Sequence, residues 1–443
     1  MSPIKDEKLT IHELKKVFTP SKPARVTFVD RLDFNDDVIT ALGMPGTQLV
    51  IYGHTGSGKS TLIENLLSRV YEKQINTNCM KGMTFEEVVL DAFDELEEFY
   101  VDEVTNSKKR TINARVKTSY LGIQTQIQNA IQSGSAVKQK RYLPPQLTPQ
   151  KLAKLLGESG YCWVLEDFHK IEGEEKEKLA QMMKVFVNLS DKYDDLKIIA
   201  IGAVNTAREV VETDEEMNTR ISEFKVPLMS ESEIRQIIIK GCDALNIIIP
   251  VDLQDEIIRY SNGLGSICHK LCYFMCDAAL IRETIKDPVE FNYVDLKEAL
   301  KKYLKSIEDT VKMAFERAMT ISKVENTIRI IANESQDHEG SGLDELLKWA
   351  EEHHININRK KLLADLAKLE TERYGELINF SEDSSKYSFS NPFYGAYALA
   401  YFEEEDKKMR KAAKKSEKEM MQILNNAFKT FTQNVAPDDE GEN

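Results

Sequence analysis

The feature that most constrains this chain is a glycine-rich segment, GHTGSGKS, at residues 53–60. It fits the pattern G-x-x-x-x-G-K-[ST] at every fixed position, and an apolar run, Gln48–Tyr52, precedes it while a helical pattern, Thr61–Val70, follows it. In such a strand, loop and helix unit, the backbone N–H groups of the loop and the positive end of the helix dipole converge on one point. The segment therefore predicts a phosphate-binding loop on an α/β sheet.

The positions of this loop have distinct expected roles in holding a nucleoside triphosphate. Gly53, Gly56 and Gly58 let the backbone turn with its N–H groups facing inward. Lys59 is expected to reach the β- and γ-phosphates, and the hydroxyl of Ser60 is expected to bind Mg²⁺. The predicted binding residues are Gly53, His54, Thr55, Gly56, Ser57, Gly58, Lys59, Ser60 and Thr61.

Two acidic residues come where a second buried strand is expected to end. Residues 161–169 read YCWVLEDFH, an apolar run that leads into Glu166 and Asp167. Open α/β sheets bind ligands at the carboxyl ends of their strands, and a phosphate loop needs a carboxylate there to hold Mg²⁺ and often a second one to orient the attacking water. We expect Glu166 on the Mg²⁺ side and Asp167 as the residue that orients the water, with the opposite assignment left open.

Two further polar residues flank predicted strands. Asn205 follows the apolar run Lys197–Val204, where its amide could bind the γ-phosphate or the attacking water, or could cap the next helix. Arg220 lies just before the last predicted strand and could reach the γ-phosphate of a neighbouring subunit, or be a surface arginine. Arg208 competes for either role. Both Asn205 and Arg220 are therefore candidate catalytic residues.

The sequence pattern changes along the chain and predicts four parts after a short polar leader at residues 1–25. Residues 26–228 alternate apolar runs with helical patterns, which is typical of a parallel sheet covered by helices on both faces. Residues 229–318 have helical patterns only, and residues 319–402 combine three helices with a hairpin, as in a winged helix. Residues 403–443 are expected to be a charged helix with an acidic tail.

Local signals place several of these elements. Strands are predicted at Gln48–Tyr52, Cys162–Leu165, Lys197–Ile201 and Glu223–Val226, and hairpin strands at Leu377–Phe380 and Tyr387–Phe389. Ser230 with Glu233 forms a capping box that begins a helix extending to about Leu245. Further helices are expected from about Gly265 to Lys286 and from Val294 to about Ala318.

Together, the phosphate loop, the acidic strand end, Asn205, Arg220 and the helical segment resemble the AAA+ superfamily. Within it they resemble the clade of origin-recognition and initiator ATPases, transposition-type ATPases and signalling STAND NTPases. Residues 28–31 (FVDR) resemble the strand-and-Arg box before the loop in these families, and residues 226–237 (VPLMSESEIRQI) resemble the boundary between sheet and lid. The resemblance covers about residues 26–390.

This resemblance implies an α/β P-loop NTPase fold of AAA+ type, followed by an all-helical lid and a winged-helix domain. It also implies a molecular switch that binds ATP with Mg²⁺ and hydrolyses the β–γ bond. Such a switch would act through nucleotide-dependent oligomerisation or contact with a protein partner, and Arg220 would complete the site across the interface of a homo-oligomer. The ATPase component of a bacterial anti-phage defence system is one role that the resemblance suggests.

The sequence departs from the family pattern in the lid. These proteins commonly offer a sensor arginine near the start of the third lid helix, whereas residues 262–271 (NGLGSICHKL) contain none. His269 or Lys270 would have to replace it. The departure and the unusual Glu-Asp order allow a slow nucleotide cycle, or a nucleotide-gated scaffold that does not hydrolyse ATP.

A second alternative is a DNA-binding initiator or transposition-type ATPase that uses the helix predicted at residues 358–372. This helix carries basic residues that a major groove would accept: Arg359, Lys360, Lys361 and Lys368. The turn of the predicted hairpin, however, holds Glu382 and Asp383, and acidic groups repel phosphate. A protein partner is therefore the preferred expectation for this part.

Composition narrows the class of protein further. The chain has 59 Lys+Arg against 73 Asp+Glu, a formal net charge of −14, which argues against a chain-wide basic surface for nucleic acid. No apolar run approaches the roughly 18–20 residues that a membrane span needs, and the N-terminal residues lack the apolar core of a secretory signal. Six cysteines in 443 residues do not make a disulfide framework, so a cytoplasmic protein is expected.

Overall fold

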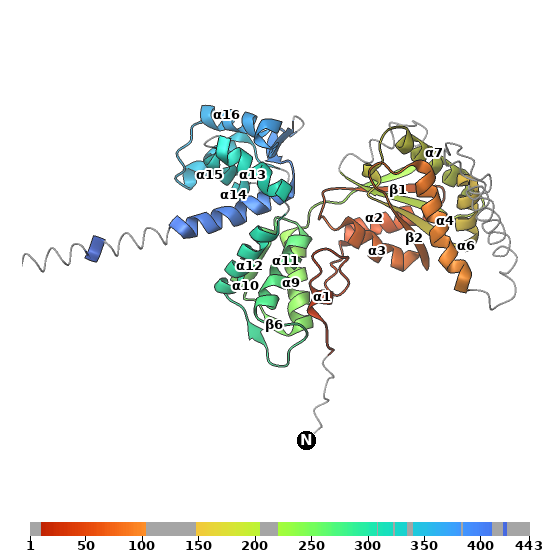
Figure 1. Ribbon diagram of the computed structural model, residues 1–443, viewed down its shortest axis with the longest axis horizontal. Coiled ribbons are helices and arrows are strands. Elements are labelled where there is room, and N and C mark those ends of the chain that lie inside the picture. The colour runs from red at the N-terminus through yellow and green to blue at the C-terminus, as the bar shows by residue number, and fades with distance from the viewer. Residues whose placement is uncertain are drawn as a thin grey trace, which may run out of the picture. The chain divides into compact units, whose positions relative to one another are not determined.

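The structure is a computed structural model that describes residues 10–102, 148–203, 220–307, 309–321, 324–334, 340–381, 384–409 and 420–422. The chain divides into two compact units, whose helices and strands are drawn in Figure 1. The first contains Met1–Ile248, Gly263–Tyr273 and Ile281–Val289, and the second contains Ile249–Asn262, Phe274–Leu280 and Glu290–Asn443. The helices that follow the sheet therefore contribute to both units. The four consecutive parts predicted from the sequence remain a prediction.

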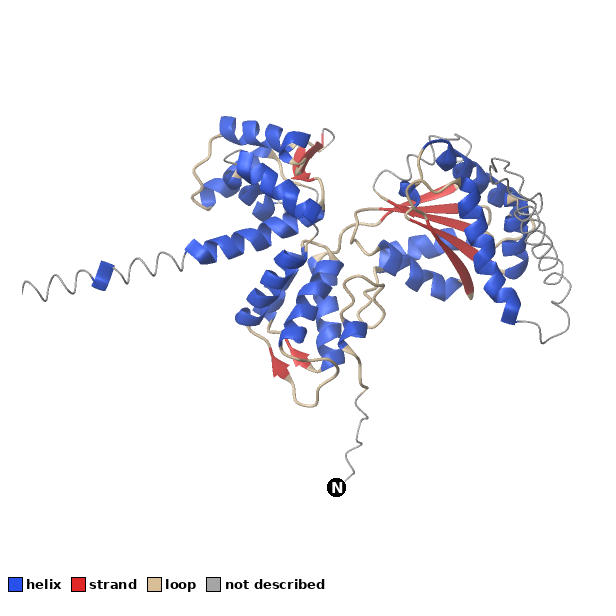
Figure 2. Ribbon diagram, viewed as in Figure 1, coloured by secondary structure: helices blue, strands red, loops and turns tan. Residues whose placement is uncertain are grey.

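The first unit is built around a parallel sheet of five strands in the order β2-β3-β4-β1-β5 (Figure 2). The strands are β1 (Gln48–Tyr52), β2 (Lys73–Asn78), β3 (Tyr161–Glu166), β4 (Lys197–Gly202) and β5 (Ile221–Lys225). The central strands are buried on both faces, which is why they read as continuous apolar runs. Four of the five strands were predicted from such runs, and the structure confirms them.

Strand β2 was not predicted, because its sequence KQINTN contains one apolar residue. It lies at one edge of the sheet beside β3, where only Ile75 and Thr77 of its side chains are buried. An edge strand needs less apolar surface than a central strand, so the sequence signal was weak.

Helices cover both faces of this sheet (Figures 1 and 2). The helices α2 (Leu32–Gly43) and α3 (Lys59–Val70) pack on one face, and α4 (Phe85–Asp102), α6 (Pro149–Ser159) and α7 (Gly173–Leu189) pack on the other. Successive side chains of a strand point to opposite faces. Accordingly, Leu49 and Ile51 of β1 join the core under α2 and α3, whereas Val50 joins the core under α7.

The remaining elements of the first unit include α1 (Leu14–Val17), the 3-10 turn η1 (Phe168–Lys170), α9 (Glu231–Leu245) and β6 (Ile247–Ile248). The structure confirms the predicted start of α9: Ser230 Oγ accepts a hydrogen bond from Glu233 N at 3.3 Å, and Glu233 Oε2 accepts one from Ser230 N at 2.7 Å. The helix ends before Asn246, which has a left-handed conformation.

Helix α11 (Gly265–Ala278) begins in the first unit and ends in the second. The prediction that it extends to Lys286 was wrong. Leu280 has φ 60°, and from Arg282 onward the backbone bonds the N-terminal segment, with Leu14 N donating to Arg282 O and Thr284 N donating to His12 O. These distant partners end the helix early. The short strand β7 (Val289–Glu290) follows and pairs with β6.

The second unit is mainly helical. Its helices are α10 (Val251–Ser261), α12 (Tyr293–Ser306), α13 (Asp309–Ile321), α14 (Glu325–Glu334), α15 (Leu343–Glu352), α16 (Arg359–Leu369), the 3-10 turn η3 (Glu372–Tyr374) and a helical segment at 392–409. The single helix predicted from Val294 to Ala318 is two helices, because Ile307 has an extended conformation after α12.

A two-stranded antiparallel hairpin of β8 (Ile378–Ser381) and β9 (Lys386–Phe389) follows the third of three consecutive helices, α14, α15 and α16. The hairpin strands lie within one residue of the predicted ends. The acidic residues Glu382 and Asp383 of its turn lie outside the described residues, as do most residues of the predicted charged tail. The assignment of these elements to a winged helix remains a prediction.

The fold class predicted from the sequence is confirmed as an α/β P-loop NTPase with a helical C-terminal part. The parallel sheet carries the glycine-rich loop between β1 and α3, and helices follow the last strand of the sheet. Among the helices that the structure describes, none has both the length and the apolar composition needed to span a bilayer.

Candidate nucleotide-binding site

The glycine-rich loop connects the carboxyl end of β1 to the first turn of α3. Gly53, Gly56 and Gly58 have φ values of 152°, 80° and 89°, a region that residues with a Cβ atom rarely adopt. At Gly53, an added Cβ would lie 2.6 Å from the carbonyl oxygen of Val226. The loop conformation therefore requires glycine at these positions, and Gly53 also permits close approach of the chain that follows β5.

Lys59 is held over the loop by the loop's own backbone. Its Nζ donates hydrogen bonds to the carbonyl oxygens of Gly53 and His54, both at 2.9 Å. Burial lowers the pKa of Lys59, and the nearby carboxylates of Asp167 and Glu166 oppose this shift. The ammonium group is therefore oriented before any ligand arrives, and an anion bound there would further favour its charged form.

Ser60 and Glu166 bring two oxygen atoms together at the start of α3. The Ser60 hydroxyl donates a hydrogen bond to Glu166 Oε2 at 3.0 Å, although β4 separates β3 from β1 in the sheet. Burial raises the pKa of Glu166, and the hydrogen bond from Ser60 opposes this shift. Mg²⁺ takes octahedral oxygen ligands at 2.0–2.1 Å, which places adjacent ligands about 2.9 Å apart. The pair therefore fits a divalent cation both in chemistry and in spacing.

Asp167 lies next to this pair, but its side chain is turned to another partner. The residue has φ 56°, and its Oδ2 lies 2.6 Å from Nζ of Lys170 in an ion pair in which both side chains are about half exposed. The carboxylate predicted to orient the attacking water is therefore engaged by Lys170. The other predicted residue near the γ-phosphate, Asn205, lies outside the described residues, as does Arg208.

Arg220 lies at the opposite end of the sheet from the loop. Its carbonyl oxygen accepts a hydrogen bond from Gln48 N at 2.8 Å, at the start of β1, and the residue is exposed. Strands β1 and β5 are parallel with Tyr52 opposite Lys225, so about 16 Å of strand separates Arg220 from the loop end of β5. Arg220 therefore cannot reach the loop of its own subunit. Its predicted role across a subunit interface remains a prediction.

A cavity with a volume of about 310 Å³ lies beside the loop. It is lined by most of the predicted binding residues, namely Thr55, Gly56, Ser57, Gly58, Lys59, Ser60 and Thr61, together with Glu166 and Asp167. Gly53 and His54 are not among its lining residues and contribute instead the carbonyl oxygens that hold Lys59. The structure thus brings together the loop and the acidic strand end.

The cavity also has walls that the sequence reasoning missed. One wall is the segment from Thr19 to Val29, most of which we interpreted as a polar leader, and another is formed by Met229, Ile237 and the start of α11. Leu14, Val17 and Phe18, which come just before this segment, are fully buried. Their spacing of three and four residues was the helical signal that could have identified it.

His269 of α11 lines the same cavity as a neutral residue. Its Nδ1 accepts a hydrogen bond from Thr19 N at 3.1 Å, and Phe18 packs edge-on against its ring. Burial lowers the pKa of His269 to about 4. An uncharged imidazole cannot supply the positive charge of a sensor arginine, so the suggestion that His269 replaces it is not favoured. Lys270, the other candidate, is not among the described residues that line the cavity.

His169, two residues after Asp167, is a further cavity residue that was not predicted. Its Nδ1 is buried and has no hydrogen-bond partner among the described residues, and burial lowers the pKa of the imidazole. The cysteines Cys268, Cys272 and Cys276 on one face of α11 are buried and reduced, as expected for small core residues. Within the described residues, no cluster of three or more His, Cys, Asp or Glu side chains is suited to a metal ion.

The glycine-rich loop after β1, the carboxylate at the end of β3 and the helices that follow the sheet are now all located. The chain has the fold of an α/β P-loop NTPase with a helical C-terminal part. No protein-family model and no curated protein matches its sequence.

Several solved structures are similar to the chain at low sequence identity. The Aeropyrum pernix ORC1 protein in complex with DNA is 11% identical, with a TM-score of 0.43 over 88% of this chain and 97% of that chain. CDC6P from Pyrobaculum aerophilum is 13% identical, with a TM-score of 0.41 over 88% of this chain and 98% of that chain. The Thermotoga maritima RuvB Holliday junction branch migration motor is 11% identical, with a TM-score of 0.40 over 85% and 97%.

Proposed function

We propose that this protein binds ATP together with Mg²⁺, hydrolyses the β–γ bond and uses the nucleotide state as a switch. The observation that carries the proposal is the meeting of Ser60 and Glu166 at 3.0 Å beside a loop that already holds Lys59. A triphosphate and its cation are typically bound by two oxygen ligands, one ammonium group and a turn of inward N–H groups.

Each residue of the site would have its own role in nucleotide binding and hydrolysis. Lys59 and the loop amides would hold the β- and γ-phosphates, and Ser60 and Glu166 would hold Mg²⁺, directly or through its water. Bound Mg²⁺ would supply neutralisation of the charge that develops on the phosphates. Asp167 would orient the attacking water once it leaves Lys170, with which it forms an ion pair at 2.6 Å.

The ion pair of Asp167 favours a slow cycle as a second candidate. In that case the protein is a nucleotide-gated scaffold that retains ATP with little or no turnover. Asp167 orients no water while Lys170 holds its carboxylate, and no lid arginine is present near the start of α11. Retention of unhydrolysed ATP through purification would support this candidate, and rapid multiple turnover would exclude it.

The nucleotide state would control the assembly of the protein or its contact with a protein partner. Arg220 is exposed at the end of the sheet that faces away from its own loop, so it would serve the site of another copy in a homo-oligomer. The second unit would present the partner surface, with α14 to α16 and the hairpin as a winged helix. A role as the ATPase of an anti-phage defence system is compatible with this and is a proposal from resemblance alone.

DNA binding through residues 358–372 is a weaker alternative. Arg359 pairs with Asp344, and both Lys361 and Lys368 pair with the buried Asp365, at 2.7 and 3.2 Å. These contacts offset part of the positive charge that a phosphate backbone would need. Binding that weakens steeply with salt, and that falls on removal of Arg359, Lys360 and Lys361, would revive this alternative.

The proposed function is tested by nucleotide binding and phosphate release from the purified chain. Lys59→Ala should weaken ATP binding and abolish phosphate release, because it removes the ammonium group that the loop carbonyls of Gly53 and His54 hold. Lys81→Ala is the control, since Lys81 is exposed and pairs with Glu172 away from the cavity. Equal binding and release by wild type and Lys59→Ala would contradict the proposal.

A further inference from the structure

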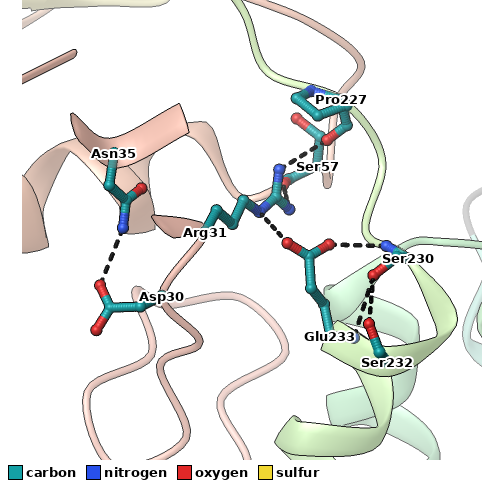
Figure 3. Close-up of polar contacts among 8 residues, drawn as sticks. All are labelled: Asp30, Arg31, Asn35, Ser57, Pro227, Ser230, Ser232 and Glu233. Atoms are coloured by element: carbon teal, nitrogen blue, oxygen red, sulfur yellow. Dashed lines mark hydrogen bonds and ion pairs between the residues drawn. The ribbon is translucent and has the colours of Figure 1, made fainter. Parts of the chain in front are cut away.

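One buried arginine joins the phosphate loop to the first lid helix (Figure 3). The side chain of Arg31 is 8% exposed. Its Nη2 donates to the carbonyl oxygen of Ser57 at 3.1 Å, its Nη1 donates to the carbonyl oxygen of Pro227 at 2.9 Å, and its Nε lies 3.5 Å from Glu233 Oε1. A single guanidinium thus contacts the loop, the chain between β5 and α9, and the first turn of α9.

The contact with Ser57 affects how the loop can bind an anion. In a trans peptide the C=O and N–H groups point in opposite directions. The hydrogen bond from Arg31 fixes the direction of the Ser57 carbonyl, so it also fixes the Gly58 N–H of the same peptide unit, directed away from Arg31. Hydrogen bonds from a charged donor are stronger than neutral ones. Arg31 therefore orients the Gly58 N–H of the phosphate loop by binding the carbonyl oxygen on the opposite side of the same peptide unit.

The contact with Glu233 makes this orientation depend on the lid. Glu233 is the third residue of α9, where its Oε2 accepts from Ser230 N at 2.7 Å while its Oε1 faces Arg31. Burial lowers the pKa of Arg31, and Glu233 opposes this shift. A buried cation that loses its counter-charge must seek another partner or water. Movement of the first turn of α9 would therefore disturb the hold of Arg31 on Ser57.

We propose that Arg31 is a positioning residue for the phosphate loop, and that Glu233 makes its hold on Ser57 depend on the position of α9. The inference rests on the proposed nucleotide-binding function and adds to it the route by which the lid senses the loop. Coupling between two sites is reciprocal. A lid position that strengthens the Arg31 contact tightens nucleotide binding, and nucleotide in the loop favours that lid position by the same factor.

The sharpest variant is Glu233→Gln, because glutamine keeps the capping box and removes only the charge that faces Arg31. The chain offers a control in Glu345, whose Oε2 accepts from Gly342 N at 2.7 Å at the start of α15, the same contact that Glu233 makes with Ser230 N. Glu345→Gln makes the same chemical change at the same helix position in the second unit. Both variants should have similar melting temperatures, so that helix capping alone is accounted for.

Two measurements test the coupling. In nucleotide-free protein, hydrogen exchange at the amides of Ser57 and Leu62, which bond within the loop region, should be about 5-fold faster in Glu233→Gln than in wild type. The affinity for ATP should fall by about 5- to 20-fold in the same variant. Glu345→Gln should change neither quantity. In an Arg31→Met background, Glu233→Gln should have no additional effect on either quantity.

Each result bears on the proposal separately from the proposed function. Equal exchange and equal affinity in Glu233→Gln and Glu345→Gln would overturn the coupling while leaving nucleotide binding intact. Faster exchange confined to α9, with the loop unchanged, would also overturn it, since the role of Glu233 would then be local. If wild type bound no nucleotide, the proposed function would fail, and loop exchange in nucleotide-free protein would still decide the coupling.

Discussion

At the scale of single residues, burial sets the charges of the site before a ligand is bound. Burial lowers the pKa of Lys59 and raises the pKa of Glu166, so it opposes the charged form of both groups. A bound phosphate favours protonated Lys59, and a bound divalent cation favours ionised Glu166. Under the proposed function, ligand binding would therefore offset the electrostatic cost of burying these two groups.

His269 gives a prediction on the pH dependence of stability. Burial lowers its pKa from 6.5 to about 4, so between these values the unfolded chain binds a proton that the folded chain does not. Stability is therefore lost as pH falls through this range, by about 3 kcal/mol in total. His269→Gln removes the titration, so its unfolding free energy should fall less between pH 6.5 and 4. Urea unfolding at several pH values measures this.

The exposed His353 of the second unit provides the comparison for this variant. His353→Gln makes the same chemical change at an exposed position, so it shows how much of any altered pH profile comes from replacing a histidine as such. A His269→Gln profile as steep as that of wild type would show that other groups cause the acid loss.

The residues that local spacing in the sequence singled out lie together beside one cavity. Lys59 and Ser60 belong to one continuous motif, and Glu166 follows an apolar strand. By contrast, the hydrogen bond between Thr19 and His269 joins residues 250 apart, and that between Arg31 and Pro227 joins residues 196 apart. Such pairs leave no pattern of local spacing in the sequence, so only the folded structure shows their contacts with the site.

At the scale of elements, the same distinction separates correct from wrong predictions. The capping box of Ser230 and Glu233 fixes the start of α9 within the chain itself, and apolar runs fix the buried strands. The end of α11 and the edge strand β2 depend on partners elsewhere, namely the N-terminal segment and β3. Tertiary contacts override local propensity at such places.

The edge strand β2 gives an element-scale prediction. Nε1 of Trp163 on β3 donates a hydrogen bond to Oγ1 of Thr77 on β2 at 3.1 Å, and Thr77 is fully buried. Thr77→Val keeps the shape of the side chain and leaves the indole N–H buried without its acceptor. The expected loss in the free energy of unfolding is about 1–3 kcal/mol. Denaturant unfolding, followed by circular dichroism, measures the change.

Trp163→Phe provides the second arm of a double-mutant cycle for this pair. In the Trp163→Phe background the donor is gone, so Thr77→Val should cost clearly less than in wild type. The same cost in both backgrounds would show that the hydrogen bond does not hold β2 to the sheet.

At the scale of the whole molecule, the net charge of −14 does not argue against phosphate ligands. Under the proposed function, the site would rely on one lysine, backbone amides and Mg²⁺, which net charge does not report. The chain does, however, place Arg220 at the end of the sheet away from the loop. Under the proposed function, a single copy would therefore lack one of its catalytic groups.

Arg220 gives the last prediction, at the scale of the assembly. Arg220→Ala should lower ATP turnover by about 10³-fold or more if the guanidinium acts as a finger in a neighbouring site, and should leave ATP affinity nearly unchanged. Lys59→Ala should also be inactive, but it retains Arg220. Mixing the two inactive variants should restore part of the turnover, because Arg220 of a Lys59→Ala subunit can complete the intact loop of an Arg220→Ala subunit.

The exposed Arg317 supplies the control variant, Arg317→Ala, which should retain full turnover. Failure of the mixture to recover activity, or a monomeric mass in the presence of ATP, would exclude the shared site.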